Sequence, residues 1–383
     1  MLRPESAAER RFRAEVRGWL EENLPPELRY LTFRPPPEVI MPWYRRLSQR
    51  GWIAPHWPRA WGGMEASPAE EVILMEEMAR AGAPDLPSQG LNHIGPILMR
   101  FGTEAQKRRH LPPIVAGDVI WCQGYSEPGA GSDLAALRTR AERRGDSLVV
   151  NGHKIWTTWG HHAQWMYALV RTSAGASRRD GITFVLIDLS TPGITRRPIR
   201  TIAGDDEFCE VFFDDVVVPL ENVVGEIDRG WEIATALLSE ERLRVAAPLQ
   251  ALRALTRLHM LCEATGALED PVLAVRVAEV EIETEALIAS YLSVAETHAA
   301  GGAVDSSYLK ILATETVQRI LDVLQEVAGE RRAVKRALPR GDRRLDFSEM
   351  FLQARRLSIY AGSNEIQRTL IATRVLGLGG GGK

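Results

Sequence analysis

The sequence predicts a mainly helical protein with a β-domain in its middle. Apolar residues recur at helical spacing in residues 1–120 and again in residues 226–383. Between them, short segments rich in β-branched and aromatic residues are separated by Gly, Asp and Ser clusters. We therefore expect an N-terminal helical domain (1–120), a middle antiparallel β-domain or barrel (121–225) and a C-terminal four-helix bundle (226–383).

Capping signals divide the N-terminal segment into helices. Ala7–Leu24 has helical apolar spacing and stops before a proline pair. Ser67 precedes a first-turn proline and an acidic first turn, and a glycine follows the apolar run. Thr103 and Gln106 match a capping box that opens another helix, which we expect to end near Gly117.

Four strand-like stretches follow in the middle segment: SLVVNGHKIWTT, QWMYALVRT, GITFVLIDL and CEVFFDDVVVP. Their separators look like hairpin turns, at Arg144–Ser147 and at Asn151–Gly152. No helix of crossover length intervenes, which favours an antiparallel over a parallel sheet.

Long apolar-periodic segments with short connections predict the C-terminal bundle. Gly230–Leu261 contains Pro248, which should kink or divide that helix. The later helices are expected at Ala274–His298, Ser306–Ala328, Phe347–Leu357 and Asn364–Leu376.

Composition narrows the function classes. The net charge of −3 gives no reason to expect nucleic acid or an anionic membrane as a partner. No apolar run approaches the roughly 18 residues of a membrane span, and the N-terminus lacks the pattern of a signal or transit peptide. We expect a cytoplasmic protein. Its three cysteines form no CxxC and its histidines no HxxxH pair, so no metal site is expected.

Two stretches could carry chemistry although Rossmann, P-loop and GxSxG motifs are missing. Residues 124–133, GYSEPGAGSD, mix small residues with hydroxyls, and the glycines allow close approach to the backbone. Residues 151–158, NGHKIWTT, bring an indole and a hydroxyl together. Taken alone, each stretch also has a purely structural explanation. Residues 124–133 could be an elaborate loop between strands, and the tryptophan in residues 151–158 could pack inside a sheet.

Taken together with two further stretches, these residues resemble the acyl-CoA dehydrogenase family. YSEPGAGSD is similar to its first signature, KIWTT to its flavin-facing strand, GWIAPHWPRAWGG to its N-terminal loop and IYAGSNEIQRTLIATRVLGL to its C-terminal signature. The matches occur in order over nearly the whole chain. The resemblance implies the three domains above, with FAD between the middle and C-terminal domains. It also implies removal of two hydrogens from an acyl-CoA thioester, giving trans-2-enoyl-CoA.

The resemblance also implies site residues. Trp156 would stack on the isoalloxazine, and Thr158 would direct its hydroxyl to flavin N5, where the hydride arrives. The remaining positions matched to FAD contacts are Tyr125, Ser126, Gly131, Ser132, Gln325, Gly329, Ser363 and Glu365. Those matched to substrate contacts are Ser132, Arg242, Ala361 and Gly362.

The chain departs from the family pattern at the catalytic base. Many members carry a glutamate between the tyrosine and glycine of the C-terminal signature, where this chain has Ala361. On a helix, Glu241 would share an apolar face with Leu237 and Val245. The pattern leaves two readings open: a functional carboxylate on an apolar face, or a partner of a neighbouring arginine at the bundle edge.

The resemblance favours the first reading. Members similar to isovaleryl-CoA dehydrogenase carry their base on this helix in a Glu-Arg-Leu context, which Glu241-Arg242-Leu243 matches. Glu241 is therefore expected to take the α-proton, with Glu240 as the alternative. Arg242 would orient local charges, and the Ala361 N–H would help to polarise the thioester carbonyl.

Partners follow from the same resemblance. Electrons would pass to an electron-transfer flavoprotein, and the chain would form a homotetramer or a heterotetramer with a related subunit. The family's cross-subunit FAD stretches are only partly matched, through Gln325 and Gly329, so the alternative is a non-catalytic or half-site subunit of an α2β2 enzyme. A third possibility is a flavoenzyme with other chemistry, such as nitroalkane oxidation. A base on the helix would leave room for branched, long or ring-bearing acyl groups.

Overall fold

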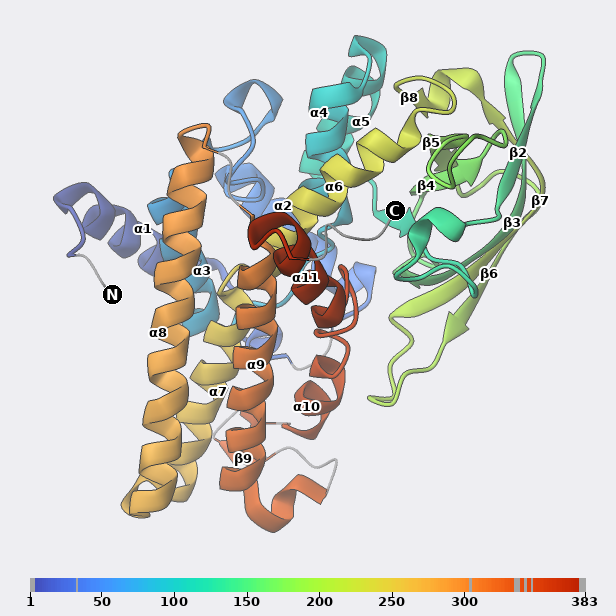
Figure 1. Cartoon of the computed structure of the whole chain (residues 1–383). Helices are drawn as coiled ribbons and strands as arrows, with labels where there is room; N and C mark the ends of the chain where they lie inside the picture. Colours follow the sequence, from blue (N-terminus) through green and yellow to red (C-terminus); the bar gives the residue numbers. More distant parts are fainter. Residues whose placement is uncertain are drawn as a thin grey trace. The chain divides into compact units, whose positions relative to one another are not determined.

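The structure is a computed structural model that describes residues 4–31, 34–302, 305–333, 338–340, 343–345 and 347–378 (Figure 1). Its contacts divide the chain into two compact units. The first comprises residues 1–36, 66–85 and 242–383, and the second residues 37–65 and 86–241. The three-domain division predicted from the sequence stays a prediction.

The first unit is helical. Its α-helices are α1 (Ala7–Asn23), α3 (Pro68–Ala81), α7 (Leu249–Thr265), α8 (Pro271–Ala299), α9 (Ser307–Ala328), α10 (Ser348–Ala354) and α11 (Asn364–Leu370). Shorter elements are the 3₁₀ turns Pro26–Leu28, Ala267–Glu269 and Gly329–Ala333, the π-turn Ile371–Val375 and the hairpin β9 (Leu338–Arg340) and β10 (Arg343–Leu345). α9 packs against α7, α8, α10 and α11, while α3 packs against α1, α7 and α8 (Figure 1). One apolar core joins α3, α7, α8, α9 and α10, with Leu258, Leu287, Leu309 and Ile320 fully buried in it.

The second unit combines helices with a sheet. Its helices are α2 (Pro37–Arg50), the π-helix Gln89–Ile94, α4 (Gly95–Phe101) and α5 (Glu104–Ala116), with 3₁₀ turns at Arg59–Trp61, Leu134–Ala136 and Leu220–Asn222. α6 (Gly230–Val245) begins in this unit, which includes Glu241, and its last residues belong to the first unit.

The strands are β1 (Trp121–Gly124), β2 (Arg140–Arg144), β3 (Ser147–Thr158), β4 (Trp165–Arg171), β5 (Ile182–Asp188), β6 (Ile194–Ile199), β7 (Phe208–Pro219) and β8 (Val223–Val224). They form one sheet in the order β6-β7-β3-β2-β4-β5-β8, and β1 pairs with β4. The pairing is antiparallel as predicted, except that β4 is parallel to β1 and, through one residue pair, to β2. Neither β1 nor β2 is joined directly to β4 by a turn, since β3 lies between them in the chain, so these pairs are not constrained to be antiparallel as hairpin strands are.

Several local predictions are confirmed. Thr103 forms the predicted capping box, Ser67 is the predicted N-cap and also forms a box with Glu70, and Gly82 and Gly117 end their helices in the left-handed conformation. Pro248 divides the predicted long helix into α6 and α7. A proline cannot donate the backbone hydrogen bond that a continuous helix requires at that position.

The predicted turn at Asn151–Gly152 is wrong. Both residues lie inside β3, where the pairing with β7 shifts register between Val150 and Gly152. Asn151 is held there by two hydrogen bonds with Asp215 across the sheet, of 2.9 and 3.0 Å. A Cβ at Gly152 would come within 2.5 Å of Thr139, so this glycine serves a bulge with close neighbours instead of a hairpin.

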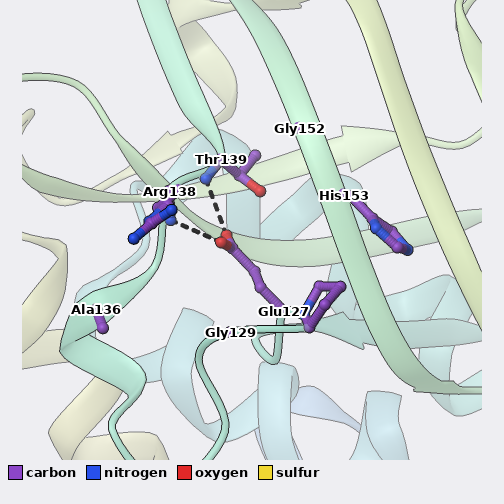
Figure 2. Close-up of a pocket in the computed structure, with 8 residues that line it drawn as sticks. Glu127, Gly129, Ala136, Arg138, Thr139, Gly152 and His153 are labelled. Atoms are coloured by element: carbon purple, nitrogen blue, oxygen red, sulfur yellow. Dashed lines mark hydrogen bonds between the residues drawn. The ribbon is translucent and has the colours of Figure 1, made fainter.

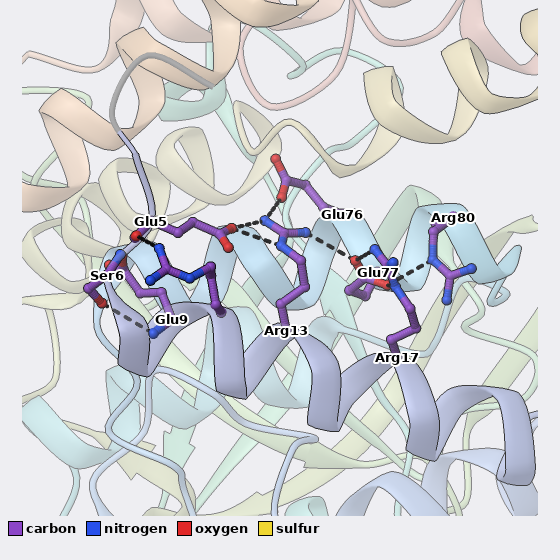
Figure 3. Close-up of polar contacts among 9 residues, drawn as sticks. Glu5, Ser6, Glu9, Arg13, Arg17, Glu76, Glu77 and Arg80 are labelled. Atoms are coloured by element: carbon purple, nitrogen blue, oxygen red, sulfur yellow. Dashed lines mark hydrogen bonds and ion pairs between the residues drawn. The ribbon is translucent and has the colours of Figure 1, made fainter.

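A buried carboxylate ties α1 to α3 (Figure 3). The Glu77 side chain lies among three guanidinium groups, from Arg13 (3.0 Å), Arg17 (2.8 Å) and Arg80 (2.8 Å). Burial alone would raise the pKa of Glu77, but hydrogen bonds from Arg17, Arg80 and Arg13 outweigh it and lower the pKa to about 2. The ion pairs therefore stabilise the charged form of the carboxyl group.

This arrangement predicts a pH-dependent stability. In the unfolded chain the Glu77 carboxyl titrates near 4.5, so its contribution is fully present above that pH and is lost as the pH falls toward 2. We expect Glu77→Gln to lower the free energy of unfolding at pH 7 by about 3 kcal/mol. Urea unfolding between pH 7 and pH 3 should show a smaller pH dependence in the variant. Glu221→Gln, which removes an exposed pair with Arg109, should lower it by less than about 1 kcal/mol; equal effects of the two variants would contradict the assignment.

Candidate active site

The loop 124–133, here called the serine loop, is fastened to β3 by a buried ion pair. Lys154 on β3 is fully buried, and its Nζ donates to the Glu127 carboxylate (2.8 Å) and to the Tyr125 carbonyl (3.1 Å). The Ile155 N–H donates to the Ser126 carbonyl over 2.9 Å. Burial lowers the pKa of Lys154 to about 8, although the Glu127 carboxylate opposes the shift. Ser126 is thereby held directly beside the strand that carries Trp156.

The Glu127 carboxylate also organises the end of the loop. It accepts from the N–H groups of Arg138 (2.6 Å) and Thr139 (2.9 Å) (Figure 2). A pocket of about 330 Å³ opens beside it, lined by Glu127, Pro128, Gly129, Ala136, Arg138, Thr139, Gly152 and His153. None of the site residues predicted from the sequence lines this pocket.

Trp156 is presented outward by a bulge in β3. The pairing of β3 with β7 shifts register between Lys154 and Thr157, and Trp156 has a φ of +61°. A left-handed conformation costs a residue with a side chain roughly 1–2 kcal/mol. The bulge leaves the indole 57% exposed, although Phe208 lies edge-on to it at 6.1 Å. A strained backbone that exposes a large aromatic face indicates a site for a flat partner.

The other predicted residues of this unit lie in two settings. Gly131 and Ser132 are exposed at the tip of the serine loop, and apart from its chain neighbours no described residue has an atom within 4 Å of a Cβ built at Gly131. The protein itself thus does not require a glycine there. Thr158 is half-buried at the end of β3, where it pairs with Phe208.

Glu241 lies on the buried face of α6. It is only 6% exposed, and Leu237, one turn earlier, is fully buried. Its Oε2 is buried without a hydrogen-bond partner among the residues that the structure describes. Glu240 is more exposed, and Arg244 pairs with Glu71 of α3 at 3.1 Å. Of the two adjacent glutamates, Glu241 has the environment expected of a functional carboxylate.

His93, Tyr125 and Tyr167 of this unit are buried polar aromatic residues that lie near enough to Glu241 to interact electrostatically with its carboxylate. The Tyr167 hydroxyl donates to Gln89 Oε1 and lies 2.8 Å from Nδ1 of His93. Tyr125 meets Tyr167 edge-on, and its buried hydroxyl has no hydrogen-bond partner in the described part of the chain. Burial, and less strongly the Glu241 carboxylate, raises the pKa of both tyrosines well above 10. Burial lowers the pKa of His93, with the Glu241 carboxylate opposing, which favours the neutral imidazole.

The remaining predicted residues belong to the first unit. Ala361 and Gly362 form a loop with φ values of +54° and +76°, and Ser363 caps α11 by accepting from the Ile366 N–H. Glu365 is exposed. Gly329 is exposed at the end of α9, whereas the Gln325 carboxamide donates to the Phe347 carbonyl over 3.0 Å. The half-buried Arg242 follows Glu241 on α6.

Sequence reasoning missed the buried polar residues behind the site. Lys154 is part of the KIWTT stretch, but no role was predicted for it, and its ion pair with Glu127 joins residues that are 27 positions apart in the sequence. His93 and Tyr167 are separated by 74 positions. No local pattern indicates such contacts, although a charged residue inside a strand next to apolar positions was a usable signal for Lys154.

Comparisons with known proteins identify the class to which this fold and site belong. Three family models match in order: the acyl-CoA dehydrogenase N-terminal domain (residues 6–118), middle domain (122–216) and C-terminal domain (228–376). Acyl-CoA dehydrogenase IpdE1 of Mycobacterium tuberculosis is 39% identical over 378 residues, covering 96% of this chain and 97% of the relative.

Solved structures agree. The Tcur3481-Tcur3483 steroid ACAD matches with a TM-score of 0.88 and 31% identity, over 98% of both chains. The ChsE4-ChsE5 complex from Mycobacterium tuberculosis matches with a TM-score of 0.86 and 32% identity, over 99% of both chains.

The fold and the family matches thus define a flavoprotein oxidoreductase. The chain belongs to the acyl-CoA dehydrogenase family, whose members bind FAD, and the resemblance seen in the sequence is confirmed. The exposed indole of Trp156 and the neighbouring hydroxyl of Thr158 fit a flat flavin ring. No helix in the described part of the chain is both long and apolar enough to cross a membrane.

Proposed function

We propose that this acyl-CoA dehydrogenase removes the α-proton of an acyl-CoA thioester with the Glu241 carboxylate while the β-hydrogen leaves as a hydride, which gives trans-2-enoyl-CoA. The observation that carries the proposal is the buried Oε2 of Glu241, which lacks a partner among the described residues. A buried acceptor without a hydrogen bond lowers stability by about 1–3 kcal/mol. A buried oxygen atom without a partner is expected where its function is to accept a proton from the substrate.

The chain's other groups divide the remaining tasks. The α-proton becomes acidic enough only if the thioester carbonyl is polarised, for which the Ala361 N–H is the proposed donor. Trp156 would cover one face of the flavin and Thr158 would orient it. FAD supplies the hydride acceptor when bound. Ser126, Ser132, Ser363 and Glu365 remain proposed contacts of the cofactor or substrate.

Two features support a bulky acyl group. Ala361 has a small side chain where many family members carry a glutamate, so its loop takes up less space beside the α-carbon. The similar Tcur3481-Tcur3483 protein is described as a steroid ACAD. We therefore propose ring-bearing acyl-CoA thioesters as the substrate class, ahead of short straight chains.

A substrate panel tests this class. We expect a ring-bearing acyl-CoA to reduce the flavin at least about tenfold more efficiently, in kcat/KM, than butyryl-CoA, which corresponds to roughly 1.4 kcal/mol of transition-state binding. The measurement is anaerobic loss of flavin absorbance with straight-chain, branched and ring-bearing thioesters at equal concentrations. Preference for butyryl-CoA would contradict the substrate class while leaving the reaction type intact.

The proposed assembly is a heterotetramer with a related subunit. The ChsE4-ChsE5 and Tcur3481-Tcur3483 structures each pair two named chains, and residues 258–271, LHMLCEATGALEDP, lack the Arg-x-x-Phe-Gly stretch through which homotetramers reach a neighbour's FAD. An electron-transfer flavoprotein is the proposed electron acceptor, and the cytoplasm is the proposed location.

Co-expression tests the proposed heterotetramer. Purified alone, the chain should hold little FAD, and co-expression with a related subunit should raise the FAD-to-protein ratio. A chain that is fully loaded and active by itself would favour the homotetramer.

A further inference from the structure

The loop 358–363, here called the alanine loop, has a backbone that needs an external support. Ala361 and Gly362 follow each other with φ values of +54° and +76°. The left-handed conformation is natural for glycine but costs alanine roughly 1–2 kcal/mol. Such a conformation persists only where neighbouring contacts hold it.

The buried carboxamide of Gln367 provides that support. Gln367 is fully buried on α11, and its Nε2 donates to the carbonyls of both Ala361 (3.3 Å) and Gly362 (3.2 Å). The opposite amide orientation would put Oε1 against two carbonyl oxygens and is excluded by repulsion. A Cβ at Gly362 would approach Nε2 within 2.5 Å, so the glycine and the glutamine require each other.

A second anchor keeps α11 in place beneath the loop. Asn364 Oδ1 accepts from the buried Lys310 Nζ over 2.8 Å and from the Thr314 hydroxyl over 3.2 Å. The Asn364 N–H in turn donates to the Ser358 carbonyl over 2.9 Å and closes the loop. Gln367 therefore forms its hydrogen bonds to the loop from a fixed position on the helix.

The clamp determines where the loop's N–H groups point. Because both carbonyls are directed at one nitrogen atom, they lie on the same side of the loop. In a planar trans peptide the N–H points opposite to the C=O, so the N–H groups of Gly362 and Ser363 face the other side. The N–H groups of Ala361, Gly362 and Ser363 donate no hydrogen bond to any residue that the structure describes.

We propose that Gln367 is a positioning residue: by fixing the carbonyls of Ala361 and Gly362 it holds the left-handed backbone of Ala361, whose N–H is the proposed donor to the thioester carbonyl oxygen. The inference rests on the proposed function and adds to it the group that keeps the donors in place. Donors fixed before the reaction stabilise the developing enolate oxygen without reorganisation. Gln367 is fully buried, and its proposed effect is transmitted through the two backbone carbonyls that it binds.

Gln367→Leu tests the proposal, because leucine fills the site without donating. We expect anaerobic flavin reduction at saturating acyl-CoA to slow by roughly 10- to 100-fold, with KM changed by less than about threefold because a misaligned donor weakens the transition state more than the bound substrate. The matched control is Gln106→Leu, whose Nε2 also clamps two carbonyls, of Glu221 and Val223, both at 2.8 Å. The control should lower the melting temperature similarly and leave the rate within about twofold.

A spectroscopic readout separates positioning from general destabilisation. The probe is the [1-¹³C]-labelled 2-enoyl-CoA product of the best substrate found in the panel. Its infrared carbonyl band, when it is bound to the wild-type enzyme, should lie below its position in water, and Gln367→Leu should move it back while Gln106→Leu does not. An unchanged rate in Gln367→Leu, or no lowering of the band in the wild type, overturns the inference about Gln367. The assignment of Glu241 as the base does not depend on either result. If no acyl-CoA reduces the flavin of the wild type, the proposed function fails as well.

Discussion

Glu241→Gln is expected to slow flavin reduction by acyl-CoA by about 10²–10⁴-fold, the range typical for loss of a general base. Glutamine keeps the shape of the side chain but cannot accept a proton. Glu241 is buried on α6, with Oε2 unpaired among the described residues, so no neighbouring hydrogen bond should collapse when the charge is removed. FAD content and fold should therefore stay close to those of the wild type.

The adjacent residue supplies the control for this prediction. Glu240 is more exposed and lies on a different face of α6, so Glu240→Gln should change the rate by less than about threefold. Stopped-flow measurement under anaerobic conditions gives both rates with the same acyl-CoA. If Glu240→Gln lost activity and Glu241→Gln retained it, the base would be Glu240.

Lys154→Met is expected to lower the free energy of unfolding by about 3–5 kcal/mol, because it leaves the buried Glu127 carboxylate without its counter-charge. The same change should loosen the serine loop, since Lys154 also donates to the Tyr125 carbonyl. Flavin affinity should fall with it. Urea unfolding and the FAD-to-protein ratio after gel filtration measure the two effects.

A double variant separates the charge effect from the loss of packing. Lys154→Met/Glu127→Gln removes both charges and should recover part of the stability lost in Lys154→Met, since no unpaired charge stays buried and the glutamine oxygen can still accept from one of the two N–H groups, of Arg138 or Thr139, that bind the carboxylate. Lys107→Met breaks the more exposed pair with Glu104 and should lower stability by less than about 1 kcal/mol. A loss of similar size in Lys154→Met would mean that the buried pair contributes little.

Features with a local cause could be predicted from the sequence. The N-cap at Ser67, the capping box at Thr103, the glycines that end the helices and the break at Pro248 each depend on a few neighbouring residues. The helical face of Glu241 also follows from spacing alone, and the structure buries Leu237 and Glu241 on the same side of α6.

Features that depend on residues far apart in the sequence could not be predicted in this way. Asn151–Gly152 has the letters of a turn, but hydrogen bonds to Asp215 on β7 hold it in a strand. The exposure of Trp156 depends on a bulge whose register is fixed by β7. A tryptophan on a strand is normally read as core, and nothing in the sequence near KIWTT reveals that its backbone turns the indole outward.

The same distinction between predictable and unpredictable features applies to the candidate site. Ala361 signals a missing base as soon as the family pattern is considered, since its side chain cannot take a proton. The clamp by Gln367 could not be inferred, because it needs the positive φ of Ala361 and the burial of α11 together. The pair of His93 and Tyr167 likewise requires the sheet to bring residues from distant segments together.

Exchange of the substrate's α-proton with solvent tests the central claim most directly. A 3-thia-acyl-CoA carries sulfur at the β-position, so no hydride can leave and only the proton step is observed. In D₂O the wild-type enzyme and Glu240→Gln should incorporate deuterium at the α-carbon of members of a 3-thia-acyl-CoA panel, measured by mass spectrometry, and Glu241→Gln should not. Deuterium incorporation by Glu241→Gln at the wild-type rate would contradict the assignment of Glu241 as the base.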